Sequence, residues 1–397
     1  MKQPMPGALD GLKVLDCTHV IAGAWCTLML ADLGADVIKI ENPEGEQTRG
    51  REDSAFKPFD FVNRNKRAIA LDVTRPEGAA AVRKLAETAD VFVENFRPGA
   101  LARSGLGYDD IRKVKPDIIY CSVSGFGQTG PYRDRGGFDL IAQAMSGIMS
   151  FTGEIGSKTP VAAGVPLSDL NAGLFAALAV LAALNHRSKT GEGQYVETSL
   201  FESALAYTVW ETGKHLTTGD VAERSGSRHR LAAPYEALRT KDGYMVVGVN
   251  SQRLWEKFCR ALGDPELKDD PLFAKKYARV DNRDALQARL EAILARGTTE
   301  EWIARLLAEG VPCGRLNTIA EALRDPQVEA RGLLVEVEGR KFPRAPMVMS
   351  KTPVAIKRGP PRIGQHTREV LAGAGLSEEE ISVLARIGAI KLDGESA

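Results

Sequence analysis

The alternation of strand-like and helix-like segments in the first 125 residues constrains the fold more than any other feature of the chain. Short runs rich in Val, Ile and Leu recur there, separated by stretches with turn or helical patterns. Strands joined through such crossovers run parallel, so the sequence predicts an α/β fold with a parallel sheet and helices on its faces. The predicted strands are 13–18, 35–41, 68–73, 89–95 and 117–125, and the predicted helices are 24–33, 76–88 and 108–114.

The later part of the chain predicts a second, smaller unit. An apolar helix is expected over 170–186, and 194–208 begins strand-like and passes into another helix. The polar, glycine-bearing stretch 211–234 has the composition of a linker or mobile loop. After it, Asp242-Gly243 marks the turn of a predicted hairpin. The remaining predicted features are helices at 251–262, 282–296 and 299–308, a strand at 333–339, and a capping box formed by Ser377 and Glu380.

Charge and cysteine content exclude several kinds of partner. Lys plus Arg equals Asp plus Glu, at 52 each, so no global field favours nucleic acid or an anionic membrane. The five cysteines are scattered without C-x-x-C spacing, which indicates neither a disulfide framework nor a metal site. The N-terminus lacks the apolar core of a signal peptide, and the apolar run Leu170–Leu184 is shorter than the ~20 residues that a bilayer requires. We therefore expect a cytoplasmic protein with no membrane partner.

Asp169 is the one charged residue in the stretch from 164 to 186. One interpretation is structural, because Asp at a helix N-terminus accepts a hydrogen bond from an unpaired backbone N–H. The other is chemical, because a lone carboxylate in apolar surroundings can act as a nucleophile. The segment by itself leaves both interpretations open.

Loops at the carboxyl ends of the predicted strands are the expected place for a ligand. His19 follows the first strand, but the Ala22-Gly23-Ala24 stretch beside it is not a G-x-G-x-x-G turn, so NAD binding is not predicted. Arg97 and Arg103 follow the fourth strand, and guanidinium groups match phosphate oxygens. The long Gly- and Pro-rich loop 125–139 has a length typical of functional loops.

Taken together, these motifs resemble the family III CoA-transferases, a group that also includes the α-methylacyl-CoA racemases. The resemblance is carried in family order over nearly the whole chain by VLDCTHVIAG, LGADVIKIE, ADVFVENFRPGALARSGLGYDDI, SVSGFGQTGP, PLSDLNAGLFAALAVLAAL, KTGEGQYVETSLFESAL and GVPCG.

The resemblance implies a Rossmann-like large domain built from both termini, a smaller inserted α+β domain, and two chains threaded through each other as an interlocked homodimer. The implied domains are 1–210 for the large domain, 211–234 for a linker or lid, 235–325 for the small domain, and 326–397 for the return to the large domain.

The resemblance also implies roles for individual residues. Asp169 corresponds to the catalytic aspartate of the transferases, and Gly226 and Arg228 fall in the segment implied to cover the substrate. Coenzyme A and its esters are implied as substrates rather than as tightly bound cofactors. The implied CoA-binding residues are His19, Ile21, Ala22, Leu71, Asp72, Val73, Thr74, Asn95, Phe96, Arg97, Arg103 and Phe138.

Departures from the family pattern narrow the expected activity. The racemases have a histidine where this chain has Phe138, which disfavours exchange of a proton at an α-carbon. Ile21 and the broken glycine run SGSRH disfavour formyl or oxalate specificity, and Asn42 replaces a basic residue found in some members. Arg224, Arg228 and Arg230 suggest a dicarboxylic acid, since guanidinium groups bind carboxylates.

We therefore expect CoA transfer from succinyl-CoA or a similar donor to a carboxylic acid, and in particular to a dicarboxylic acid. Racemisation of an α-methylacyl-CoA is the alternative activity. A CoA- or nucleotide-binding regulator without catalysis is the non-enzymatic alternative.

Overall fold

The computed structural model describes residues 6–51 and 53–394, which form two compact units. Unit 1 consists of residues 1–149, 162–220 and 331–397, and unit 2 consists of residues 150–161 and 221–330. Each unit has its own hydrophobic core. The domain boundaries expected from the sequence stay a prediction.

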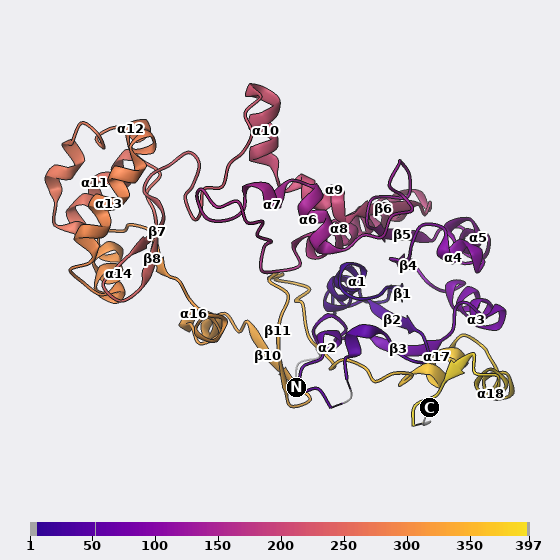
Figure 1. The fold of residues 1–397 in the computed structure, drawn as a ribbon. Coiled ribbons are helices and arrows are strands. Elements are labelled where there is room, and N and C mark those ends of the chain that lie inside the picture. Colours follow the sequence, from indigo (N-terminus) through magenta and orange to yellow (C-terminus); the bar gives the residue numbers. More distant parts are fainter. Residues whose placement is uncertain (1–5, 52, 395–397) are drawn as a thin grey trace. The chain divides into compact units, whose positions relative to one another are not determined.

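A seven-stranded sheet forms the centre of unit 1, in the order β12-β3-β2-β1-β4-β5-β6 (Figure 1). The first six strands along the chain pair in parallel, and β12 alone pairs antiparallel, with β3. The predicted α/β class with its mostly parallel sheet is therefore confirmed. The strands are β1 (Lys13–Cys17), β2 (Asp36–Glu41), β3 (Arg67–Leu71), β4 (Val91–Glu94), β5 (Ile119–Ser124), β6 (Tyr195–Ser199) and β12 (Ile390–Lys391).

Helices cover both faces of this sheet, as Figure 1 shows. The helices on one face include α1 (Ala22–Asp32) and α8 (Leu167–Thr190). The opposite face packs a continuous apolar cluster under α3 (Pro76–Ala86), α4 (Ala100–Arg103), α5 (Tyr108–Val114), α17 (Thr367–Gly373) and α18 (Glu378–Arg386). The other helices of this unit are α2 (Pro58–Val62), α6 (Asp139–Met145), α7 (Ile148–Phe151, shared with unit 2), α9 (Leu200–Ala206), α10 (Val209–Thr218) and the 3-10 turn η1 (Gln47–Arg49).

Helix α8 packs closely against α1 because of a glycine at their crossing. A Cβ atom on Gly173 would lie 2.5 Å from the carbonyl oxygen of Ala22 and 2.9 Å from Cβ of Trp25. Among the described residues, α8 is the helix whose length and hydropathy would also suit a membrane span. Core helices of water-soluble proteins pass the same test, and buried small residues such as Ala172 and Ala176 line its packed side.

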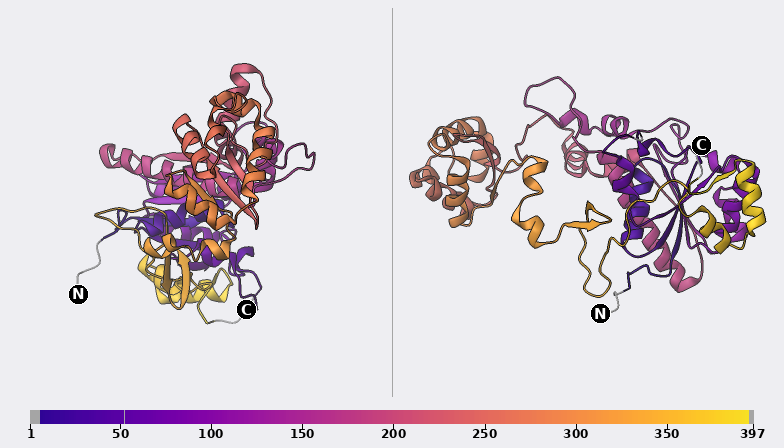
Figure 2. Two further views of the ribbon diagram at one scale, coloured as in Figure 1. Left: turned by 90° about the vertical axis from the view of Figure 1, so that its left-hand side faces the viewer. Right: turned by 90° about the horizontal axis from the view of Figure 1, so that it is seen from below.

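The end of the chain completes the sheet of unit 1. β12 adds to the edge of β3, with Ile390 opposite Leu71, and the N–H of Asp72 donates to the carbonyl of Ala389. The right-hand view of Figure 2 shows the yellow C-terminal segment lying beside the strands of the N-terminal part. Ser377 and Glu380 form the predicted capping box at the start of α18.

Unit 2 is built on a three-stranded antiparallel sheet covered by helices. Its strands are β7 (Tyr235–Arg239), β8 (Tyr244–Gly248) and β9 (Cys313–Arg315), and β7 and β8 form the predicted hairpin. Its other elements are α11 (Gln252–Leu262), η2 (Pro265–Asp269), α12 (Lys276–Asp281), α13 (Arg283–Leu294), α14 (Thr299–Ala308), α15 (Ile319–Ala322) and α16 (Pro326–Ala330). The hairpin β10 (Leu334–Val337) and β11 (Arg340–Pro343) follows in unit 1.

The linker predicted from composition at 211–234 is partly helical. α10 continues to Thr218 and ends at Gly219, whose φ of +78° allows its N–H to bond the carbonyl of His215. Polar composition alone does not stop a helix, and the chain has no proline in this stretch before the glycine.

Candidate active site

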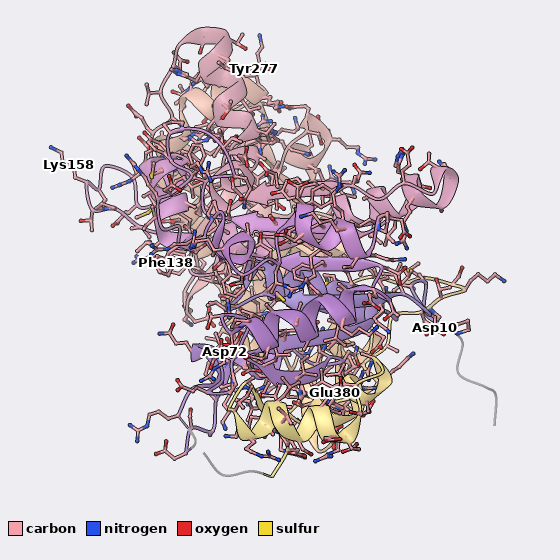
Figure 3. The ribbon with its side chains drawn as sticks, turned by 90° about the vertical axis from the view of Figure 1, so that its right-hand side faces the viewer. Asp10, Asp72, Phe138, Lys158, Tyr277 and Glu380 are labelled. Carbon is pink, nitrogen blue, oxygen red and sulfur yellow. The ribbon has the colours of Figure 1, made fainter. Side chains whose placement is uncertain are left out.

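A pocket of about 240 Å³ lies at the carboxyl edge of the parallel sheet, within unit 1. Three loops form most of it, and they follow β1, β4 and β5. Figure 3 labels Asp72, just after β3, and Phe138, after β5, on one side of the sheet, and Asp10, which precedes β1, on the other. The lining residues are His19, Val20, Ile21, Ala22, Asn95, Phe96, Arg97, Pro98, Val123, Ser124, Gly125, Arg135, Gly136, Gly137, Phe138, Asp169 and Leu200.

The loops after β1 and β4 are tied together by one side chain. Asn95 accepts a hydrogen bond from the N–H of His19 at 2.7 Å and donates one to the carbonyl of His19 at 2.8 Å. The His19 ring meets Phe96 edge to face, with centroids 4.5 Å apart. This two-way amide bond holds the His19 backbone in place, next to Val20, whose φ of +61° is unusual for a β-branched residue.

The His19 imidazole is held in its neutral form. Burial lowers its pKa, and the positive charge of Lys39 lowers it further, although Glu46 and other carboxylates oppose the shift. The neutral ring offers one donor and one acceptor to a ligand rather than a fixed positive charge.

Buried charges under the β1 loop support this edge of the site. Lys66 pairs with Asp16 at 2.9 Å, and Lys39 pairs with Glu46 at 3.0 Å and donates to the carbonyl of Thr18. Burial would raise the pKa of Asp16, but the charges of Lys66 and Lys39 and hydrogen bonds outweigh it and hold that pKa at about 2. These fixed pairs anchor the loop that carries His19.

Asp169 is the third residue of α8, and its side chain reaches the pocket. Burial raises the pKa of its carboxyl to about 7, with the negative charge of Asp139 as the second cause. Among the described residues, none donates a hydrogen bond to this carboxyl group. The Asp169 oxygens are therefore available to a substrate.

The structural interpretation of Asp169 as a helix cap does not hold. Pro166 is the N-cap of α8, and Asp139 supplies the bond that a cap would make, by accepting the N–H of Ser168 at 2.7 Å. The other Asp139 oxygen accepts from Gln143 at 2.7 Å, and Gln143 accepts from the N–H of Ala163 at 2.9 Å. Two residues of α6 thus hold the start of α8 and leave Asp169 free.

Two glycines allow the loop of Phe138 to cross the end of β5. A Cβ atom on Gly137 would lie 2.2 Å from Cα of Gly125, a distance that real Cβ atoms do not reach. The crossing brings Phe138, which is 72% exposed, and Arg135 to the pocket.

Two guanidinium groups line the pocket, those of Arg97 and Arg135. In the described part of the chain, no carboxylate forms an ion pair with either. Arg135 stacks over the ring of Tyr132, with its central carbon 3.8 Å from the ring centroid. Two positively charged groups and the Asp169 carboxyl therefore line the same pocket.

The pocket brings together eight of the residues expected from the sequence: His19, Ile21, Ala22, Asn95, Phe96, Arg97, Phe138 and Asp169. Leu71 is the last residue of β3, and Asp72, Val73 and Thr74 follow it at the same edge of the sheet. None of these four residues lines the pocket, and Arg103 lies on α4. Gly226 and Arg228 belong to unit 2.

The arginines of the expected lid have partners inside unit 2. Arg228 pairs with Glu236 at 3.2 Å and with Asp284 at 2.7 Å, and Arg224 donates to the carbonyl of Ser157. Arg230 donates to the carbonyl of Glu223 at 3.1 Å.

Sequence reasoning did not single out Arg135, Asp139, Gln143 or Gly137. The signal for them was the unusual length of the loop 125–139, which predicts function but no particular residue. Within residues 6–51 and 53–394, no group of three His, Cys, Asp or Glu side chains could hold a metal ion.

Comparison with known proteins places these motifs in one family. The model of "CoA-transferase family III" matches residues 9–367. The chain belongs to this family. It is an enzyme of the CoA-transferase type, and the expectation drawn from its motifs is confirmed.

Relatives of known activity cover nearly the whole chain. A succinate–glutarate CoA-transferase of Agrobacterium fabrum is 38% identical over 92% of this chain and 95% of its own length. A succinyl-CoA:glutarate CoA-transferase of Mus musculus is 40% identical over 91% of this chain and 85% of its own. The crystal structure of a CAIB/BAIF family protein from Brucella suis, 37% identical, superimposes with a TM-score of 0.85 and covers 93% of this chain and 100% of that one. This likeness confirms the α/β fold.

Proposed function

We propose that the enzyme transfers coenzyme A from an acyl-CoA, with succinyl-CoA or a similar ester as donor, to a dicarboxylic acid through covalent intermediates on Asp169. The observation that carries the proposal is the Asp169 carboxyl, which lines the pocket without a hydrogen-bond donor among the described residues and has a pKa of about 7. Relatives that act on succinate and glutarate, succinyl-CoA and glutarate, or succinyl-CoA and D-citramalate support the choice of dicarboxylic acids.

The transfer requires four balanced steps. The Asp169 carboxylate attacks the thioester carbonyl, CoA thiolate leaves, and a mixed anhydride of Asp169 and the acyl group forms. The thiolate then attacks the Asp169 carbonyl, which releases the first acid and leaves an aspartyl-CoA thioester. The second acid attacks this thioester to form a new anhydride and CoA thiolate. Attack of that thiolate on the acyl carbonyl releases the new acyl-CoA and restores the carboxylate.

The surroundings of Asp169 suit this chemistry. Its position in the first turn of α8 places negative charge near the positive end of the helix dipole, which favours the ionised carboxylate and developing oxyanions nearby. Asp169 is half-buried at the pocket, which limits the access of water that would hydrolyse an anhydride.

We assign CoA binding to the residues at the carboxyl edge of the sheet. The Asn95-bridged loops at His19 and Phe96 lie beside Asp169, and Arg97 offers a guanidinium for phosphate. Leu71–Thr74 and Arg103 continue the same edge for the adenosine part, and CoA is a substrate rather than a tightly held cofactor. The substrate-covering role expected for Gly226 and Arg228, which belong to unit 2, stays a prediction.

A homodimer accounts for the apolar surface of unit 1. Leu178, Val209, Trp210 and Leu216 are 62%, 65%, 56% and 80% exposed on α8 and α10. A monomer rarely leaves so many large apolar side chains in water, and a second copy of the chain threaded through the first would cover them. Light scattering after gel filtration should give twice the 42.9 kDa chain mass.

A cytoplasmic location agrees with five free cysteines, four of them buried.

Trapping the covalent intermediate tests the mechanism. Enzyme incubated with succinyl-CoA and then with hydroxylamine should yield a hydroxamate on the peptide that contains Asp169, while peptides with other carboxylates serve as internal controls. Asp169→Ala should yield no adduct and should lose at least about 10³-fold in activity. Turnover by wild-type enzyme with an unmodified Asp169 peptide would contradict the proposal.

Racemisation remains the alternative activity. Racemisation requires two proton-transfer groups, and His19 carries the one imidazole among the described residues of the pocket. At the position where the racemases have a histidine, this chain has Phe138. Incorporation of solvent deuterium at the α-carbon without an acceptor acid would favour this activity over CoA transfer.

A further inference from the structure

A dicarboxylic substrate brings a second negative charge into a pocket that already contains Asp169. The distal carboxylate loses water on binding and is repelled by the ionised nucleophile, so a cation must compensate it. The question is which cation of the chain does so.

Three residues with basic side chains line the pocket: His19, Arg97 and Arg135. The His19 imidazole is neutral because burial and Lys39 lower its pKa. The Lys39 ammonium under it is fully buried and already pairs with Glu46. The candidates are therefore the two arginines.

The two arginines come from different loops, and the Arg97 guanidinium lies 3.7 Å from the position that a Cβ atom on Gly136 would take. Arg97 follows Asn95 and Phe96 at the end of β4, in the loop tied to His19. Arg135 belongs to the segment that leads directly into Asp139, and Asp139 binds the backbone of Ser168, next to Asp169. Arg135 is thus on the segment that holds the nucleophile's helix, and Arg97 is on the loop expected to hold CoA.

The exposed Arg135 side chain contacts its own loop. Its guanidinium stacks on Tyr132, whose ring meets Phe126 at 5.7 Å between centroids. The backbone N–H of Arg135 donates to the carbonyl of Tyr132 at 2.9 Å, and the crossing of Gly137 over Gly125 fixes the following residues. Such a group loses little entropy on binding a carboxylate with its two-pronged fork.

We propose that Arg135 binds the distal carboxylate of the dicarboxylic substrate and so sets the preference for diacids over monoacids, an inference that rests on the proposed CoA transfer at Asp169. The role was expected for the arginines at 224, 228 and 230. Arg228, however, is neutralised by Glu236 and Asp284, whereas Arg135 has no carboxylate partner among the described residues.

Steady-state kinetics with matched acids test the assignment. Glutarate and pentanoate have the same chain length and differ in the distal carboxylate, so the ratio of their kcat/KM values, with succinyl-CoA as common donor, isolates its recognition. Arg135→Leu should lower this ratio roughly 10- to 100-fold, the value of a charge-assisted hydrogen bond, through KM for glutarate. Arg135→Lys should restore part of the ratio. Arg133→Leu, in the same loop but outside the pocket lining, is the matched control and should keep the wild-type ratio.

The outcomes separate the inference from the function on which it rests. If wild-type enzyme transfers CoA to neither acid nor to any other carboxylic acid, the proposed function fails. If wild-type enzyme transfers CoA but does not distinguish the two acids, or Arg135→Leu keeps the wild-type ratio, the inference is overturned. It is also overturned if Arg135→Leu raises KM equally for both acids and for the CoA ester, because Arg135 would then bind CoA. Arg97→Leu should show that last pattern.

Discussion

The charge of Asp139 should set the pH at which the enzyme becomes active. Burial raises the pKa of Asp169 from its ordinary value of 3.8 to about 7, and the negative charge of Asp139 is the second cause. Burial is the larger cause, so Asp139→Asn should lower the pKa of Asp169 by the smaller part of this difference; a decrease of about 1 pH unit would correspond to about 1.4 kcal/mol. Asp139→Asn removes this charge and keeps an oxygen that can accept the N–H of Ser168.

The assay is the pH profile of kcat/KM for succinyl-CoA, which reports the essential groups of the free enzyme. Because only the ionised carboxylate attacks, wild-type activity should rise with pH through about 7. In Asp139→Asn the rise should lie about 1 unit lower, so that at pH 6 the variant reaches about fivefold more of its own plateau than wild type does. The thermal midpoint should be measured alongside, since the new amide faces Gln143 and costs about 1 kcal/mol.

Glu94 provides the necessary control. Burial raises its pKa to about 7 as well, although Ser122 and the N–H of Phe96 oppose the shift by donating to it. Glu94→Gln should leave the rise in activity near pH 7 if Asp169 is responsible for it. A rise that disappears in Glu94→Gln and keeps its wild-type position in Asp139→Asn would refute the reasoning.

Three further predictions concern the scaffold. Asp16→Asn should lower the free energy of unfolding in urea by about 3–5 kcal/mol, because Lys66 loses its buried partner. The native pKa of Asp16 is about 2, so the stability that Asp16 supplies is present above its ordinary pKa of 3.8 and is lost as the pH falls towards 2. The variant should therefore lose less stability between pH 4 and pH 2 than the wild type does. Gly137→Ala should lower the free energy of unfolding by about 1–3 kcal/mol, measured by thermal unfolding, because its Cβ would collide with Gly125. Gly136→Ala should keep a midpoint close to wild type, since the nearest atom to its Cβ would be an Arg97 nitrogen at 3.7 Å. Equal midpoints of the two variants would contradict the crossing. Gly173→Val should separate α8 from α1 and reduce both stability and activity, while Gly213→Ala on α10, with open space around it, should change the midpoint little or raise it; a neutral Gly173→Val would speak against the close helix contact.

The parallel sheet could be predicted because its strands are marked by apolar runs between helical patterns. β12 could not, since two residues carry no pattern and their place depends on pairing with β3, hundreds of positions earlier in the chain. The helix α10 was hidden by its polar composition, which indicates solvent exposure rather than a loop.

The candidate site was partly predictable for the same reason. Residues that follow parallel strands meet at one edge, so His19, Asn95 and Arg97 could be expected together. The function of Asp139 could not be read in advance, because its partner Ser168 is 29 residues away and the bond exists only when α6 meets α8. Arg135 escaped notice because its place depends on the crossing of Gly125 and Gly137.

The place of β12 affects how the protein folds during synthesis. Because β12 comes from residues 390–391, the β3 edge stays open while the ribosome is still synthesising the chain. Unit 2, which has a core of its own, is synthesised before β12 and can fold before the last strand of the larger sheet is available. Truncation before residue 390 should therefore expose an unpaired strand edge and promote aggregation.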